Sequence, residues 1–135
     1  EAELILDAGE IEWNGEYLTA KDGFVRHFFR TKFWEKEPEV YDEIVFQPDP
    51  LPADIAEKAI TKADRKELLY YGPNEKPLFI GHYWMKGIPG PITHNIACID
   101  YSAVKYGRLV AYRMDGETRL DPDKFCWTRV ERKED

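Results

Sequence analysis

Short apolar runs separated by turn residues dominate the first third of the chain. The runs ELIL and EYLTA and the segment 24–33 are rich in β-branched and aromatic residues, and Asn-Gly at Asn14 and Asp-Gly at Asp22 supply turn chemistry. In the segment 24–33 the alternation of apolar and polar positions is partial, so a strand buried on both faces and a helix both stay open. The pattern predicts a β-rich segment over residues 1–47.

A proline-rich stretch and one helical pattern follow. The run QPDPLP has three prolines in six residues, which excludes a helix interior or a central strand. Beyond it, apolar residues recur at nearly helical spacing, with Asp54 early and Arg65 late, as the helix macrodipole favours. The pattern predicts a loop and then one helix over about residues 53–69.

From Pro77 onward the pattern is again that of strands. The run PLFI predicts a short buried strand that ends at Gly81-His82, and open α/β sheets place their ligands at the carboxyl ends of such strands. After a loop rich in Gly and Pro, two apolar runs flank a turn at residues 105–107, which predicts a β-hairpin or two adjacent antiparallel strands. We expect an α+β or α/β fold in one domain or domain fragment, organised as an insertion-like segment 1–47, a loop and helix 48–76, and a strand and hairpin region 77–135.

Composition and charge narrow the class of protein. The 135 residues include four Trp, eight Tyr and seven Phe, far from the composition of a disordered segment. The net charge of −7 repels a phosphate backbone, so nucleic acid is not an expected partner. The sequence contains no membrane-spanning apolar run and no export signal, and Cys98 and Cys126 make a poor disulfide framework. We expect a cytoplasmic protein with reduced thiols and no membrane partner.

His82 is the leading candidate for chemistry. It stands between an apolar strand and the aromatic pair Tyr83 and Trp84, and Gly81 is expected to let the backbone turn tightly beside it. An imidazole at a strand end can hold a metal ion through one ring nitrogen while a second group fixes the other. A satisfied structural histidine is the alternative.

Three further residues are weaker candidates. His94 follows the Gly-Pro loop and either approaches the same pocket or faces solvent. His27 either has a functional role or fills one face of a strand. Asp100 closes an apolar run, where a carboxylate either orients a histidine or accepts backbone donors in an Asx-type turn. No Walker A, GxGxxG, HExxH or GxSxG motif is present.

The block PLFIGHYWMKGIPGPITHNIACIDYSAVKYGRLVAYRMDGE, residues 77–117, resembles the closing segment of calcineurin-like metallophosphoesterases. The similarity is to the bacterial branch of serine/threonine protein phosphatases and symmetrical diadenosine tetraphosphatases. In that branch a strand ends in Gly-His, a loop follows, and two strands read roughly ACIDYS and GGxLVAYR. These correspond to Gly81-His82, residues 97–102 and residues 106–113. The upstream run DGFVRHFFRTKFW resembles the same branch more loosely, as an insertion.

The resemblance implies a two-sheet sandwich flanked by helices and a site with two divalent metals, which are Mn, Fe, Zn or Mg. His82 would ligate one ion, and the possible site neighbours are Gly81, Tyr83, Trp84, His94 and Asp100. Such a site activates a water that attacks a phosphate ester. The Asp-x-His, Gly-Asp-x-x-Asp and Gly-Asn-His motifs of the family do not occur in this sequence, and one imidazole cannot hold two metals.

Because that family carries the missing motifs nearer its amino terminus, we expect this chain to be the carboxy-terminal portion of a longer phosphoesterase, silent on its own. Its partner would be the amino-terminal half of that protein or a second copy. The substrate would be a phosphoprotein, a dinucleoside polyphosphate or a small phosphate ester. A degenerate relative that keeps only the scaffold is one alternative. A non-catalytic interaction domain that docks a protein through Trp13, Phe29, Phe33 and Trp34 is another.

Overall fold

The computed structural model describes residues 3–5, 10–12, 18–19, 25–26, 28–46 and 51–133, and below residue 30 it describes the backbone alone. Trp13, His27 and the side chain of Phe29 therefore lie outside the described residues. The elements in chain order are β1 (Glu3–Ile5), β2 (Glu10–Glu12), β3 (Leu18–Thr19), β4 (Val25–Arg26), β5 (Phe28–Thr31), α1 (Tyr41–Ile44), β6 (Val45–Phe46), α2 (Ala53–Ala56), α3 (Lys62–Glu67), β7 (Leu78–Ile80), β8 (Ile96–Cys98), β9 (Asp100–Tyr101), η1 (Ala103–Lys105), β10 (Arg108–Tyr112), η2 (Pro122–Lys124) and β11 (Phe125–Arg129).

The chain divides into two compact units. The terminal unit combines Glu1–Asp7 with Pro73–Asp135, and the inserted unit is Ala8–Gly72. Strand β1 belongs to the terminal unit because it pairs with β7, far along the sequence. Both helices and strands are present, so the mixed α+β class is confirmed. No helix in the described part of the chain is long and apolar enough to cross a membrane.

A three-stranded parallel sheet forms the centre of the terminal unit. Its order is β1-β7-β8, with Ile80 of the central strand paired to Ile5 on one side and to Cys98 on the other. Ile80 and all three residues of β8 are buried. A parallel strand covered on both faces requires such a continuous apolar run, which is why the run PLFI predicts this strand correctly.

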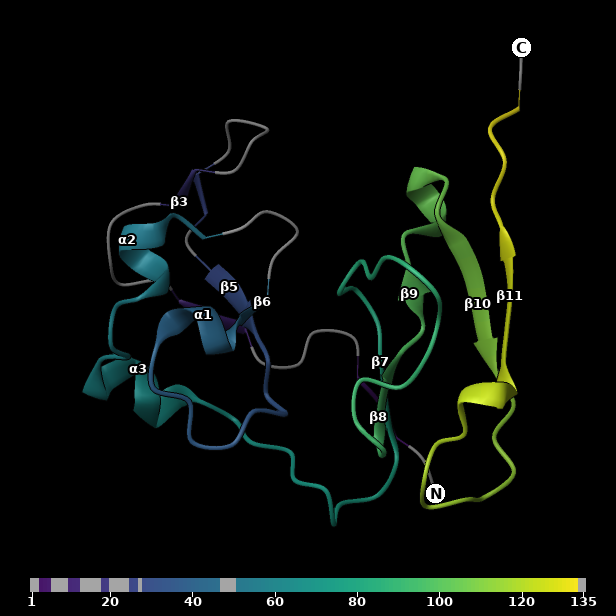
Figure 1. Ribbon diagram of the computed structural model, residues 1–135, viewed down its shortest axis with the longest axis horizontal. Coiled ribbons are helices and arrows are strands. Elements are labelled where there is room, and N and C mark those ends of the chain that lie inside the picture. Colours follow the sequence, from purple (N-terminus) through teal and green to yellow (C-terminus); the bar gives the residue numbers. More distant parts are fainter. Residues whose placement is uncertain are drawn as a thin grey trace. The chain divides into compact units, whose positions relative to one another are not determined.

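An antiparallel sheet of order β11-β10-β9 completes the terminal unit, and its strands β10 and β11 lie side by side (Figure 1). The Tyr112 ring of β10 lies 4.9 Å from the ring of Phe125 and 5.2 Å from the ring of Phe79, between centroids. The predicted hairpin is confirmed for β9 and β10, which pair in antiparallel register. Gly107 is required at its turn, because a Cβ there would lie 2.2 Å from the carbonyl oxygen of Tyr101.

The inserted unit contains the sheet β2-β5-β6, the pair β3-β4 and the three short α-helices. The strand content predicted for residues 1–47 is confirmed within the described residues. Its core is a cluster of Tyr41, Ile44, Val45 and Ile60. This cluster joins α1 and β6 to the segment that separates α2 from α3.

The prediction of one helix over residues 53–69 is wrong. Helix α2 ends at Ala56, and α3 starts at Lys62 with Thr61 as its N-cap, whose Oγ1 accepts the Asp64 amide at 3.1 Å. Between the helices the backbone pairs with residues before α1, since the Ile60 amide donates to the Glu39 carbonyl at 3.0 Å. Long-range backbone pairing has overridden a helical pattern that was correct only locally.

A buried hydrogen bond connects the two helices α1 and α3. The Tyr41 hydroxyl donates to Oδ2 of Asp64 at 2.5 Å and accepts the Thr61 amide at 3.3 Å, and both side chains are buried. Burial and the Asp64 carboxylate raise the pKa of Tyr41, so the hydroxyl keeps its proton at neutral pH. The Asp64 carboxylate is thus held in the core by a neutral donor.

We expect Tyr41→Phe to lower the free energy of unfolding by about 1–3 kcal/mol, because it leaves a buried carboxylate and a buried amide without this partner. Urea unfolding followed by circular dichroism measures the loss. Tyr70→Phe is the matched control, since the Tyr70 side chain is 50% exposed. Equal unfolding midpoints for the two variants would contradict a stabilising role for the Tyr41–Asp64 bond.

Charged groups organise the connection from β10 to β11. The Tyr112 hydroxyl donates to Oε1 of Glu117 at 2.6 Å and accepts the Asp121 amide at 3.0 Å. The Lys124 ammonium lies 3.1 Å from Oε1 of Glu117 and 2.8 Å from Oδ2 of Asp115. The hydrogen bond from Tyr112, followed by backbone donors and Lys124, lowers the pKa of Glu117 from 4.5 to about 2.

A carboxyl group with a lowered pKa in the folded state contributes stability above its unfolded pKa and loses it as the pH falls to its folded pKa. We therefore expect the thermal unfolding midpoint of Glu117→Gln to fall less steeply than that of the wild type between pH 4.5 and about 2. Glu131→Gln, an exposed acid near the carboxyl end, is the control and should follow the wild type. Parallel pH profiles for Glu117→Gln and the wild type would contradict this role.

Candidate functional site

His82 lies immediately beyond the carboxyl end of the central strand β7. Its backbone is left-handed, with φ 65°, and Trp84 is left-handed with φ 50°. The left-handed angles of this turn fall on His82 and Trp84, and Gly81 is not among the residues with positive φ. Left-handed backbone is uncommon for residues other than glycine and carries a conformational cost, so neighbouring contacts must stabilise this turn.

Asp100 supplies those contacts from the start of β9. Its Oδ2 accepts the His82 amide at 3.1 Å, and its Oδ1 accepts the Ser102 amide at 3.0 Å. Its backbone carbonyl accepts the Met85 amide at 2.9 Å. The prediction that Asp100 accepts backbone donors at a turn is confirmed, and one of those donors belongs to His82 itself. A single carboxylate therefore fixes two left-handed residues, since Ser102 has φ 63°.

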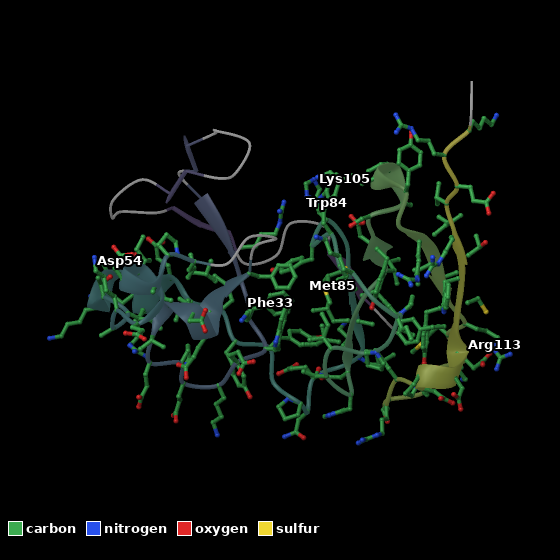
Figure 2. The ribbon with its side chains drawn as sticks, turned by 45° about the horizontal axis from the view of Figure 1, so that its top comes forward. Phe33, Asp54, Trp84, Met85, Lys105 and Arg113 are labelled. Carbon is green, nitrogen blue, oxygen red and sulfur yellow. The ribbon has the colours of Figure 1, made fainter. Side chains whose placement is uncertain are left out.

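Trp84 lies against the His82 ring, and Lys105 lies against Trp84 in turn. The His82 and Trp84 rings meet edge to face, with centroids 6.3 Å apart and an interplanar angle of 73°. The Lys105 ammonium lies 4.1 Å from the centroid of the Trp84 ring, and Figure 2 shows the two side chains next to one another. Tyr83, between the two left-handed residues, is only 2% exposed. The buried Tyr83 thus anchors the turn, and the exposed His82 faces outward.

The loop after this turn is held at two more points. The Tyr101 hydroxyl accepts the Gly90 amide at 3.1 Å, and the Ser102 hydroxyl donates to the Met85 carbonyl at 3.2 Å. These bonds join the β7–β8 loop to β9 and to the residue that follows it. The loop is therefore tied to the same structural element that fixes His82.

A cleft of about 370 Å³ opens beside the turn. His82 and Asp100 line it from one side, and Arg108 lines it from β10, together with apolar residues of β9 and β10. The sequence identifies His82 and Asp100 as candidates, whereas Arg108 was missed. The signal was present, because Arg108, Val110 and Tyr112 occupy alternate positions of one strand and Val110 is buried.

His94 does not share this cleft. It lines a separate cavity of about 630 Å³ with Lys76, Glu117 and Arg119. Its Nε2 lies 2.7 Å from the carbonyl oxygen of Pro73, so the ring ties the loop before β7 to the loop before β8. The structure therefore separates His94 from the proposed site neighbours of His82.

Neither cysteine has the environment of a nucleophile. Both carry free thiols, Cys98 buried and Cys126 exposed. Burial raises the pKa of the Cys98 thiol to about 11, and its Sγ lies 3.5 Å from the carbonyl oxygen and 3.4 Å from the amide nitrogen of Asp100. The Cys98 thiol stays protonated at neutral pH and serves as a small core residue.

The aromatic docking surface expected as an alternative is not assembled by its described members. Phe33 is only 4% exposed. The half-buried Trp34 packs edge to face on Phe33 at 5.2 Å and on Phe46 at 6.2 Å. Phe33 therefore contributes to packing, and Trp34 divides its surface between packing and solvent.

The residues present do not make a complete metal site. Across residues 30–46 and 51–133, no three His, Cys, Asp or Glu side chains are grouped so that they could hold a metal ion. His82 offers one imidazole, and both Asp100 oxygens already accept amides. A divalent metal needs several ligands at fixed geometry, so a metal at His82 would need donors from elsewhere.

Comparison with known proteins returned no matching family model, no matching curated protein and no matching solved structure.

We expect Asp100→Ala to lower the free energy of unfolding by about 1–3 kcal/mol, since it removes the acceptor of two amides that support left-handed backbone. Hydrogen exchange of the His82 and Ser102 amides should accelerate in the same variant. Asp100→Asn keeps one carbonyl oxygen and should lose less stability. Unchanged exchange at both amides in Asp100→Ala would contradict the role assigned to this carboxylate.

Proposed function

We propose that this chain is the carboxy-terminal portion of a metal-dependent phosphoesterase and that His82 is one ligand of its metal centre. The observation that carries the proposal is the position of His82, left-handed and beyond the end of the central parallel strand, with its amide held by Asp100. Ligands of open parallel sheets bind at the carboxyl ends of the strands. The mixed α+β fold is compatible with the two-sheet sandwich of calcineurin-like enzymes, which is proposed here as the parent fold.

The energetic logic of the turn supports this assignment. A left-handed histidine carries a conformational cost, and such costs tend to persist where function requires one backbone geometry. Asp100 offsets this cost by accepting the backbone amide of His82. That hydrogen bond does not involve a ring nitrogen of His82. Trp84 restricts the ring from one side, which favours one orientation of the imidazole.

The metal centre must be shared with residues outside the described part of the chain. We propose that the remaining ligands come from the amino-terminal half of a longer protein, and that two divalent ions, Mn, Fe, Zn or Mg, bind in the completed site. When bound, such ions would activate water and neutralise the negative charge of the phosphoryl oxygens. The chain alone is proposed to be catalytically silent, to hold no metal stably and to associate with that missing half or with a second copy.

The substrate is proposed to be a phosphate ester of the phosphoprotein or dinucleoside polyphosphate type, handled in the cytoplasm. The net charge of −7 argues against binding to nucleic acid or to an anionic membrane surface. Among the candidate residues that the structure describes, His82 alone combines exposure, a strand-end position and a fixed backbone.

The test is Mn²⁺-supported hydrolysis of p-nitrophenyl phosphate by the full-length protein. We expect His82→Ala to lower kcat/KM by at least about a hundredfold, because even partners that only orient metal ligands cost about 10- to 100-fold. His94→Ala is the matched control and should retain activity, since His94 lines a different cavity.

Two outcomes would contradict the proposal. Unchanged activity of His82→Ala would exclude His82 as a ligand. A full-length protein without metal-dependent activity on phosphate esters, across Mn²⁺, Fe²⁺, Zn²⁺ and Mg²⁺, would indicate a degenerate relative that has kept only the scaffold.

A further inference from the structure

Arg108 is a positively charged residue that lines the cleft beside His82. It is the first residue of β10. Its Nε is buried, and within residues 30–46 and 51–133 no acceptor bonds to it. A buried N–H donor without an acceptor costs free energy, so such a group calls for an explanation.

The position of the guanidinium group is fixed by an aromatic side chain. Its central carbon lies 4.9 Å from the ring centroid of Trp127 on β11. Trp127 pairs with Val110, so Arg108 and Trp127 share one face of the sheet. Stacking on an aromatic ring leaves the edge of the guanidinium plane, with its N–H groups, open to a ligand.

One cationic and one anionic side chain line the cleft, Arg108 and Asp100, and they are not paired with each other. No ion pair within the described part of the chain involves Arg108. Asp100 lines the cleft, but each of its oxygens accepts a backbone amide. The positive charge of Arg108 therefore has no carboxylate bound to it within the described region.

We propose that Arg108 binds a non-bridging oxygen of the substrate phosphoryl group, a specific role that rests on the function proposed above. A guanidinium fork matches two phosphate oxygens, and this bidentate geometry is what distinguishes Arg from Lys at phosphate sites. The cleft volume of about 370 Å³ lies within the range of small-ligand sites. Arg108 is thus a substrate-binding residue, separate from the metal ligand His82.

The experiment compares Arg108→Met and Arg108→Lys in the full-length protein, with p-nitrophenyl phosphate as substrate and inorganic phosphate as inhibitor. Losing a charge-assisted pair should raise KM for the ester and Ki for phosphate by about tenfold to a hundredfold in Arg108→Met. Arg108→Lys should fall between, because it keeps the charge and loses the fork. The Mn²⁺ concentration that gives half-maximal activity should not change, because Arg108 is not a metal ligand.

Arg129→Met is the matched control. Arg129 is exposed, lies directly opposite Arg108 on the neighbouring strand and does not line the cleft. The Arg129→Met substitution therefore removes the same charge from the same pair of strands without changing a residue of the cleft. It should leave KM and Ki at wild-type values. Equal increases of KM and Ki in Arg129→Met and Arg108→Met would show that the effect comes from the overall positive charge of the two strands. That result would overturn the proposal.

The failure of this inference can be separated from the failure of the proposed function. If His82→Ala abolishes metal-dependent activity while both Arg108 variants keep wild-type KM and Ki, the phosphoesterase assignment stands and the role of Arg108 is wrong. Should Arg108→Met fail to fold, Arg108→Lys decides alone, and unchanged KM and Ki in that variant overturn the proposal. If the protein has no phosphoesterase activity, ³¹P line broadening of inorganic phosphate tests the cleft directly, and equal broadening by wild type and Arg108→Lys overturns it.

Discussion

The Asp100 carboxylate is the contact on which the geometry of the candidate site depends. It joins the turn after β7 to the turn after β9, because one oxygen accepts the His82 amide and the other accepts the Ser102 amide. Both of those residues are left-handed, a conformation that neither side chain favours. Without this acceptor the two turns would lose their common anchor.

This contact follows from the register of the parallel sheet. Ile80 pairs with Cys98 at the last position of each strand, and two residues further along the chain His82 lies beside Asp100, although they are 18 positions apart in sequence. The sequence identified both residues as candidates from local pattern. Their contact could not be derived from spacing, because it depends on which strands pair and in what register.

Elsewhere too, predictions are correct where local signals decide the structure and wrong where long-range pairing decides it. Strand β7 and the β9–β10 hairpin were predictable because a continuous apolar run and a glycine-containing turn are local signals. The single helix over residues 53–69 was wrong because Ile60 bonds to Glu39, a long-range pairing that the helical pattern does not reveal. Arg108 was missed because a charged residue at a strand start is ordinarily solvent-exposed, although its alternation with the buried Val110 places both on one face of the strand.

The most direct test of the central claim is the number of nitrogen nuclei coupled to bound Mn²⁺ in the full-length protein, measured by pulsed electron paramagnetic resonance with ¹⁵N-labelled histidine. If His82 is a metal ligand, His82→Ala should lose the coupling of one imidazole nitrogen, and His94→Ala should keep the wild-type spectrum. An identical set of couplings in His82→Ala and the wild type would contradict the assignment of His82 to the metal centre.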